Sequence, residues 1–388
     1  MWSERSGLMN AAIVGAFLAA LAGVAVLAWA VASPGQEDEL PLTNATTDDH
    51  LVYLLGPDEI TVVDPETREI VGTIAAEYNP EFALAPNGAA IYLTDAGGGV
   101  KMLYVIVARD GAVTLQRPAP NRIDTIGVGS NGMAVSADGR YVYIQKWEIL
   151  DGRYEGRNGY SAPSTDEWLD VFDTVAEEFS GSTPRVPDCG INGIFPPLNE
   201  GAALTVLCAR TDTLVFVDME SQEITGSISS TDVTSAEMCD EADLDFDAAA
   251  QAPDGTIYVV TKYGCIRGVD PTTATVTSAF DLDIPVDWNA FSRTVALSPS
   301  GERLLLGIRS GGSGSAEAWV VDLAGQSVLS TFPLEPSAWH FAVSPDGSLL
   351  YVVSQESTLA AFEIATGREA WRMTALNAPE VGRVAPRP

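Results

Sequence analysis

Four cysteines are the residues of this chain whose type and spacing most clearly predict a chemical bond. Cys189 precedes the first strand of an expected hairpin and Cys208 ends its second strand. Cys239 precedes the first strand of the next hairpin and Cys265 follows its second strand. Because the start of one antiparallel strand lies beside the end of the next, we expect disulfides between Cys189 and Cys208 and between Cys239 and Cys265. Disulfides require an exported chain, and four buried thiols are the alternative.

Other residue types offer little chemistry. The two histidines, His50 and His340, are too few for a multi-histidine metal site. The sequence contains no haem-attachment motif, G-x-S-x-G elbow or P-loop, and no G-x-G-x-x-G followed by a helix. The acidic stretch "CDEADLDFD" at 239–247 lacks the glycine and the closing glutamate of a calcium loop, and its alternation also suits a strand with one polar face. We therefore predict no catalytic, cofactor-binding or metal-binding residue in this chain.

A short phrase recurs along the sequence and indicates the elements that position these residues. "FAVSPDGSLLYVVS" begins at Phe341, and related phrases begin at Phe82, Met133, Ala249 and Val295. Each consists of two runs rich in β-branched or aromatic residues around a turn whose glycine can adopt a positive φ. This pattern predicts a β-hairpin.

A second pair of strands is expected after each hairpin. "LVFVDMESQEITGSI" from Leu214 is typical, with an acidic residue at the end of the first strand and polar residues in the turn. Each repeat is then a four-stranded meander. The turn glycines follow one another at intervals of 46 to 62 residues, as expected of propeller blades; they are Gly88, Gly139, Gly201, Gly255, Gly301 and Gly347.

The two ends of the repeat region complement each other. "LVYLLG" from Leu51 is a second strand without a first strand before it, and "NAPEVGRVAP" from Asn377 resembles "YNPEFALAP" from Tyr78. We expect the C-terminal strand to complete the first blade, because ring closure removes open sheet edges. The sequence thus predicts an all-β fold, a seven-bladed β-propeller over residues 51–388. An open or eight-bladed array is the alternative.

The N-terminal region predicts export. Residues 11–32 are uncharged and, as a helix, would extend about 33 Å, enough to cross a membrane. Arg5 precedes this segment and acidic residues follow it, so the N-terminus is expected inside the cell. We predict a retained anchor over residues 1–32 and a polar linker over residues 33–50. A cleaved signal peptide ending in the small residues 30–32 is the alternative, and both place the propeller on the periplasmic or extracellular side.

The charge of the chain bears on its partners. Acidic residues outnumber basic ones by 53 to 21, which gives a net charge of −32. This charge opposes binding to nucleic acid. It is consistent with a solvated surface or with attraction to a basic partner protein.

Loops that lead into the innermost strands of a propeller surround one mouth of its channel. Their aromatic and polar side chains are expected either to contact a ligand or protein partner or to fill the narrowing channel. The candidate residues are Tyr78, Asn79, Glu81, Asn131, Trp288, Asn289, Trp339 and His340.

The segment "VPDCGINGIFPPLNEGAALTVLCARTDTLVFVD" at 186–218 resembles the heavy chain of methylamine dehydrogenase, in which V-P-D-C, a following I-F-P and a second cysteine before a polar turn recur. The resemblance implies a seven-bladed propeller outside the cytoplasm, and the spacing of Cys189 and Cys208 is similar to that family's disulfide. It also implies a small partner subunit, rich in disulfides, whose tryptophan-derived quinone oxidises primary amines. The short linker, the anchor and the second cysteine pair depart from the family's usual pattern.

Three functions follow as hypotheses. The first is a non-catalytic, heavy-chain-like subunit of an exported quinoprotein amine dehydrogenase, with the quinone on a light subunit. The alternative is a membrane-anchored propeller that serves as a binding, assembly or structural subunit of a larger membrane complex. A stand-alone hydrolase such as a propeller lactonase is the third, and the lack of an evident acid, base and metal set opposes it. The resemblance predicts the fold of this chain more reliably than its activity, because propellers have many unrelated functions.

Overall fold

The Ser-Pro-Asp-Gly turns of the repeated phrase form as the sequence predicts. The N–H of Gly347 donates to the carbonyl of Ser344 at 2.8 Å, and Gly347 has a φ of +73°. This is a tight turn followed by a residue in the left-handed region, which only glycine enters without strain. Four further turns have the same bond and a positive φ, at Gly88, Gly139, Gly255 and Gly301.

The second turn of each repeat depends on the acidic residue that ends the strand before it. The carboxylate of Asp218 accepts the backbone N–H groups of Glu220 and Ser221 at 2.8 and 2.9 Å. Four residues after the aspartate, Gln222 has a φ of +56° and turns the chain into the next strand. A positive φ recurs at this place in the other repeats, at Arg68, Glu177, Ala274, Gln326 and Gly367.

A computed structural model describes residues 49–75, 81–95, 102–109, 112–118, 132–155, 161–198, 202–229, 246–261, 264–284, 288–310, 316–335, 338–354, 356–374, 376–377, 379 and 381–386. Every regular element in these residues is a β-strand, and the strands form seven antiparallel sheets. The prediction of an all-β propeller is confirmed.

The sheets follow one another along the chain. The first contains β29 (Val381–Pro386), β1 (His50–Leu55), β2 (Glu59–Asp64) and β3 (Glu69–Ala75), in that spatial order. The second contains β4 (Glu81–Leu84), β5 (Ala90–Asp95), β6 (Met102–Arg109) and β7 (Ala112–Pro118). The third contains β8 (Met133–Val135), β9 (Tyr141–Glu155), β10 (Ser161–Asp173) and β11 (Glu178–Ser182), and β12 (Val186–Pro187) also pairs with β10.

The other four sheets each have four strands. The fourth contains β13 (Ile191–Phe195), β14 (Leu204–Cys208), β15 (Thr213–Asp218) and β16 (Glu223–Ser229), and the fifth β17 (Phe246–Gln251), β18 (Ile257–Thr261), β19 (Cys265–Asp270) and β20 (Thr275–Asp281). The sixth contains β21 (Trp288–Leu297), β22 (Arg303–Ser310), β23 (Ala316–Asp322) and β24 (Ser327–Leu334), and the seventh β25 (Ala338–Val343), β26 (Leu349–Ser354), β27 (Thr358–Glu363) and β28 (Glu369–Met373).

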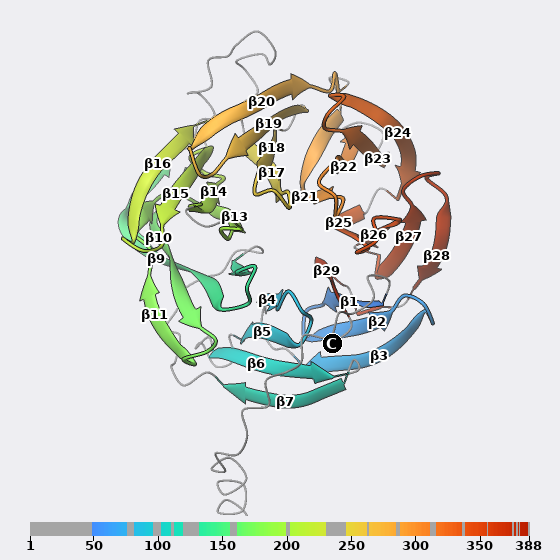
Figure 1. The fold of residues 1–388 in the computed structure, drawn as a ribbon, viewed down its shortest axis with the longest axis horizontal. Helices are drawn as coiled ribbons and strands as arrows, with labels where there is room; N and C mark the ends of the chain where they lie inside the picture. The colour runs from blue at the N-terminus through green and yellow to red at the C-terminus, as the bar shows by residue number, and fades with distance from the viewer. Residues whose placement is uncertain are drawn as a thin grey trace, which may run out of the picture. The chain divides into compact units, whose positions relative to one another are not determined.

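The sheets of the propeller lie around a common centre, with the first strand of each meander innermost (Figure 1). Neighbouring innermost strands contact each other from β4 through β8, β13, β17, β21 and β25 to β29. Each sheet is packed on both faces, so all residues of β1 and β14 are buried. The outermost strands β3 and β16 are mostly exposed.

The C-terminal strand belongs to the first sheet. β29 pairs with β1 in a register that places Val381 opposite Leu55 and Pro386 opposite His50. This is the place that the sequence analysis assigned to it. An apolar cluster that includes Leu51, Phe82 and Ala385 then joins the first sheet to the second.

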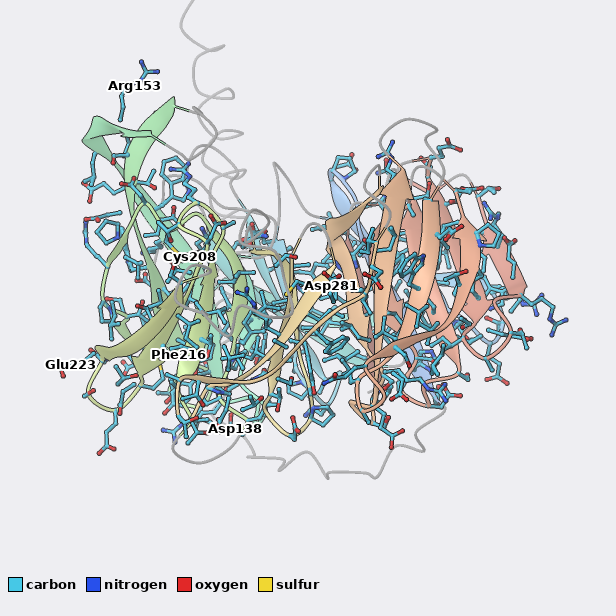
Figure 2. All side chains as sticks on the ribbon, turned by 90° about the horizontal axis from the view of Figure 1, so that it is seen from above. Asp138, Arg153, Cys208, Phe216, Glu223 and Asp281 are labelled. Carbon is cyan, nitrogen blue, oxygen red and sulfur yellow. A yellow bond between two sulfur atoms is a disulfide. The ribbon has the colours of Figure 1, made fainter. Side chains whose placement is uncertain are left out.

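The third sheet departs from the sequence-based expectation. The composition of the insert from Asp151 to Glu167, rich in Gly, Arg, Tyr and Ser, predicts an irregular surface excursion. That prediction is wrong, because β9 and β10 continue through it as one antiparallel ladder up to the pair Glu155 and Ser161, with a single irregularity between Pro163 and Thr165. Figure 2 shows Arg153 near the free end of this hairpin, beyond the ends of the other strands.

The predicted membrane segment, residues 11–32, lies outside the described residues. Within the ranges given above, no helix has the length and apolar character needed to cross a membrane.

Candidate functional site

A cavity of about 520 Å³ lies where the innermost strands of the sheets meet. Its lining comes from β4, β8, β13, β17, β21, β25 and β29, one strand from every sheet. Most of the lining side chains are apolar, among them Met133, Ile194 and Phe341. The polar side chains in the described lining are Asn192, His340 and Arg383. Apolar side chains with a few polar groups among them are the usual lining of a small-molecule site.

Arg383 brings a positive charge to this cavity. It lies on β29, and its Cζ is 5.7 Å from the centre of the Phe82 ring. Its Nε is buried and has no hydrogen-bond acceptor within the described part of the chain. Burial lowers the pKa of the Arg383 guanidinium, and the nearby carboxylate of Glu81 acts in the opposite direction. Arg383 therefore has an incompletely satisfied guanidinium beside open space.

The predicted rim residues divide into three groups. His340 lines the cavity, and Glu81 is a buried residue at the start of β4, close enough to affect Arg383. Trp288 and Asn289 are the first two residues of β21, and Trp339 is the second residue of β25; the structure describes their backbone only. Outside the described residues lie Tyr78, Asn79 and Asn131. The choice between ligand contact and channel packing stays open for these three groups.

Two polar cavity residues were not predicted, Asn192 and Arg383. A signal for Arg383 is present in the repeated phrases. Five phrases have alanine at the position three residues before the turn proline, which Ala137 replaces in one of them. These alanines are Ala83, Ala134, Ala250, Ala296 and Ala342. The C-terminal phrase has Arg383 there instead. Alignment of the innermost strands would have found this exception.

The predicted disulfide between Cys189 and Cys208 is confirmed. The two Cα atoms are 4.4 Å apart, and both cysteines are fully buried between the third and fourth sheets. Ile191 pairs with Cys208 at the start of β13, as expected of facing strand ends. Cys239 lies outside the described residues, so its bond with Cys265 stays a prediction.

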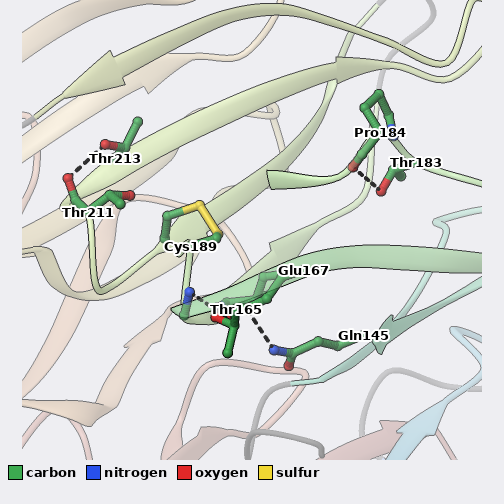
Figure 3. Close-up of a disulfide and its surroundings, with 11 residues drawn as sticks. Gln145, Thr165, Glu167, Thr183, Pro184, Cys189, Thr211 and Thr213 are labelled. Carbon is green, nitrogen blue, oxygen red and sulfur yellow. Dashed lines mark hydrogen bonds between the residues drawn. A yellow bond between two sulfur atoms is a disulfide. The ribbon is translucent and has the colours of Figure 1, made fainter. Parts of the chain in front are cut away.

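The carboxylate of Glu167 holds the segment next to this disulfide (Figure 3). Its Oε1 accepts the N–H of Gly190 at 2.8 Å, and its Oε2 accepts the N–H of Ile191 at 2.7 Å. Gln145 and Thr165 donate side-chain hydrogen bonds to the same carboxylate. Glu167 is buried, and these four donors compensate the cost of burying its charge.

Asp188 makes a second connection in the same place. Its carboxylate accepts the hydroxyl of Ser164 and the backbone N–H of Thr165. Arg210 from beyond β14 donates to the carbonyl of Pro163 and to the hydroxyl of Thr165. The V-P-D-C segment thus joins the third sheet to the fourth, and we call this group (Thr165, Glu167, Asp188–Ile191, Arg210) the clasp. The part of the sequence that most resembles the dehydrogenase heavy chain is a structural joint.

The acidic stretch is largely outside the structure. Asp240, Glu241, Asp243 and Asp245 are not among the described residues, and of Asp247 only the backbone is described, in β17. The described His, Cys, Asp and Glu side chains include no group of three that could hold a metal ion.

Comparison with known proteins shows the fold. No protein-family model and no curated protein matches the chain. A functionally unknown protein from Desulfotomaculum acetoxidans DSM 771 is 14% identical, with a TM-score of 0.59 over 86% of this chain and 98% of its own. Hydrazine synthase of Kuenenia stuttgartiensis is 17% identical, with a TM-score of 0.54 over 85% and 99%. The dihydro-heme d1 dehydrogenase NirN, in complex with DHE, is 15% identical, with a TM-score of 0.52 over 90% and 78%.

These likenesses support a β-propeller and no particular activity. The resemblance to the methylamine dehydrogenase heavy chain therefore stays a prediction.

Proposed function

We propose that this chain is a non-catalytic propeller subunit that binds a protein partner, and that its seven sheets are the seven blades of one closed ring. The observation that carries the proposal is the β9–β10 hairpin, which extends beyond the other strands (Figure 2). Ile149 and Leu150 on β9 are 53% and 36% exposed. Exposed apolar side chains on a projecting element give a partner protein apolar contact area.

The hairpin is firmly held at its base. The clasp binds Glu167 of β10 to the start of β13. On the hairpin surface, Arg185 lies over the Trp168 ring at 4.3 Å and pairs with Glu148 and Asp166. Because its base is already fixed, the hairpin loses less conformational entropy when it binds a partner protein.

The hairpin also lies on the same face of the ring as the predicted rim residues. In the sixth sheet Trp288, at the start of the innermost strand, faces Ser310 at the end of the second strand. In the third sheet, Met133 at the start of β8 pairs with Ile144 of the second strand, β9. β9 then continues beyond this pair to Glu155 and so extends past the start of the innermost strand. One face therefore carries the hairpin, Trp288, Trp339 and His340, and this is the proposed partner face.

The chemistry of the partner follows from charge. A chain with a net charge of −32 attracts a basic surface and repels an acidic one. The proposed partner presents apolar groups that contact the exposed side chains of Ile149 and Leu150, together with basic residues. The complex is expected outside the cytoplasm, with this chain anchored by residues 1–32.

The specific form of the proposal is a heavy-chain-like subunit of a quinoprotein amine dehydrogenase. The disulfide between Cys189 of the V-P-D-C motif and Cys208 supports it. The tryptophan-derived quinone would belong to a light subunit, which supplies the redox chemistry, while this chain supplies the binding surface. The second candidate is an assembly subunit of a membrane complex, and the apolar segment at residues 11–32 favours it.

Purification of the tagged full chain from its native membranes in mild detergent tests the proposal. Mass spectrometry identifies the copurifying protein, and a dye-linked assay measures amine oxidation. A cysteine-rich, quinone-bearing subunit together with amine oxidation supports the dehydrogenase form. Membrane proteins without amine oxidation support the assembly form. Catalysis by the isolated chain, of amine oxidation or lactone hydrolysis, contradicts both.

A further inference from the structure

We propose that the central cavity binds a small organic monocarboxylate, with the carboxylate on Arg383 and the apolar part of the ligand against the surrounding strands. Arg383 and the cavity are the observations that carry this inference. It is independent of the protein partner proposed above.

The position of Arg383 is unusual within the repeat. The corresponding residue of five other phrases is alanine, and Ala83, Ala134 and Ala342 line the same cavity. Packing around the centre of the ring therefore requires only a methyl group at this position. A long cation in its place brings five N–H donors among mostly apolar side chains, at a desolvation cost that packing alone does not repay.

The donors of Arg383 are not all used by the protein. Its Nε is buried and without an acceptor in the described part of the chain. The terminal nitrogens of Arg383, which lines the cavity, are the donors that a ligand can reach. A carboxylate fits them, because its two oxygens match the planar fork of a guanidinium in a bidentate pair. His340 and Asn192 also line the cavity and add polar groups near the ligand.

The rest of the lining selects the ligand class. Leu84, Met133, Ile194, Phe341 and Val384 give the cavity apolar walls. Its volume of about 520 Å³ lies within the range of small-molecule sites. Glu81 is buried and adjoins Phe82, whose ring lies beside Arg383, so its carboxylate already offsets part of the cation's charge and a monoanion is favoured over a phosphate or another dianion.

Calorimetric titration of the purified full chain with hexanoate tests this inference, with hexanamide, hexylamine and sulfate as comparison ligands. Hexanoate is expected to bind at least ten-fold more tightly than hexanamide, because the amide lacks the charge. Hexylamine and sulfate are expected not to bind. Equal binding of hexanoate and hexanamide, no binding of hexanoate, or sulfate binding as tight as hexanoate would overturn the proposal.

Two substitutions assign the effect to Arg383. Arg383→Gln should weaken hexanoate binding by about 10- to 100-fold, and Arg383→Lys, which keeps the charge but loses the fork, by less. Arg303→Gln is the matched control, since Arg303 is exposed and does not line the cavity. Unchanged affinity in a folded Arg383→Gln variant contradicts the assignment. If that variant fails to fold, the wild-type comparison of hexanoate with hexanamide still decides.

Discussion

The carboxylate of Glu167 on β10 accepts the backbone N–H of Ile191 on β13 at 2.7 Å, across the boundary between the third and fourth sheets. The same carboxylate accepts the N–H of Gly190. These bonds fix the first residues of the fourth sheet beside the disulfide and hold the base of the projecting hairpin. The clasp therefore connects the most recognisable segment of the sequence with the proposed partner face.

Glu167→Gln should lower the free energy of unfolding by about 3 kcal/mol. The amide has one acceptor oxygen for two backbone donors, and its NH₂ group faces one of them, so a buried donor loses its partner. Denaturant unfolding at pH 7 measures the change. Glu148→Gln, on the same hairpin, is the matched control, and its exposed ion pair with Arg185 is expected to contribute less than about 1 kcal/mol. Equal effects of the two substitutions would refute the role of the clasp.

The disulfide should contribute about 3 kcal/mol, because it closes a loop between residues 19 positions apart. The double variant Cys189→Ala/Cys208→Ala should lose this stability, and reduction of the wild type should lower it in the same direction. Non-reducing peptide mapping is expected to join Cys189 to Cys208 and Cys239 to Cys265. A free thiol or a cross-pair between the two sheets would show the predicted pairing to be wrong.

Deletion of residues 381–388 should lower the melting temperature by about 10 °C or more. It removes β29, so β1 loses its ladder partner and the first sheet gains an open inner edge. Differential scanning calorimetry measures the shift. Deletion of only residues 387–388 is the control and should leave the melting temperature unchanged. If both truncations melt together, β29 does not close the ring.

The aspartate turns should make stability depend on pH in the acid range. Hydrogen bonds from the N–H groups of Ser221 and Glu220 lower the pKa of Asp218, and the N–H of Thr272 and the hydroxyl of Thr273 lower that of Asp270. A carboxylate with a lowered pKa stabilises the fold above its unfolded pKa of about 3.9, and this stabilisation is lost as the pH falls through the folded value.

The double variant Asp218→Asn/Asp270→Asn should therefore be less stable than the wild type at pH 7, and the difference should vanish near pH 2. Urea titrations across this range measure it. Glu220→Gln removes a negative charge from the same turn and controls for the general repulsion in this acidic chain. A constant difference at all pH values would contradict the role of these carboxylates.

The local elements could be predicted because their causes are local. The glycine of each hairpin turn and the acidic residue before each second turn depend on neighbours a few residues away, and Cys189 and Cys208 are the facing ends of one hairpin, 19 positions apart. The β9–β10 extension was missed, because its Gly, Arg, Tyr and Ser residues conceal a ladder whose stability comes from the cross-strand pairs.

The cavity depended on long-range assembly and was harder to predict. His340 and Glu81 were identified because the sequence predicts them in loops before the innermost strands, whereas the structure has Glu81 in β4 and His340 in β25. Arg383 was missed, although it occupies a place that other phrases give to alanine, because its importance appears only when seven strands meet around one space. Glu167 was also missed, since its partners Gly190 and Ile191 lie on another sheet.

The most direct test of the proposed function is purification of the tagged full chain from native membranes, wild type beside Ile149→Ser/Leu150→Ser. Both substituted side chains are exposed, so the melting temperature should not change. The wild type is predicted to retain one partner protein with a basic surface in a fixed ratio, and the variant or high salt is predicted to release it. A wild-type chain that retains no partner in a fixed ratio, or a folded variant that retains it as well as the wild type does, would contradict the account.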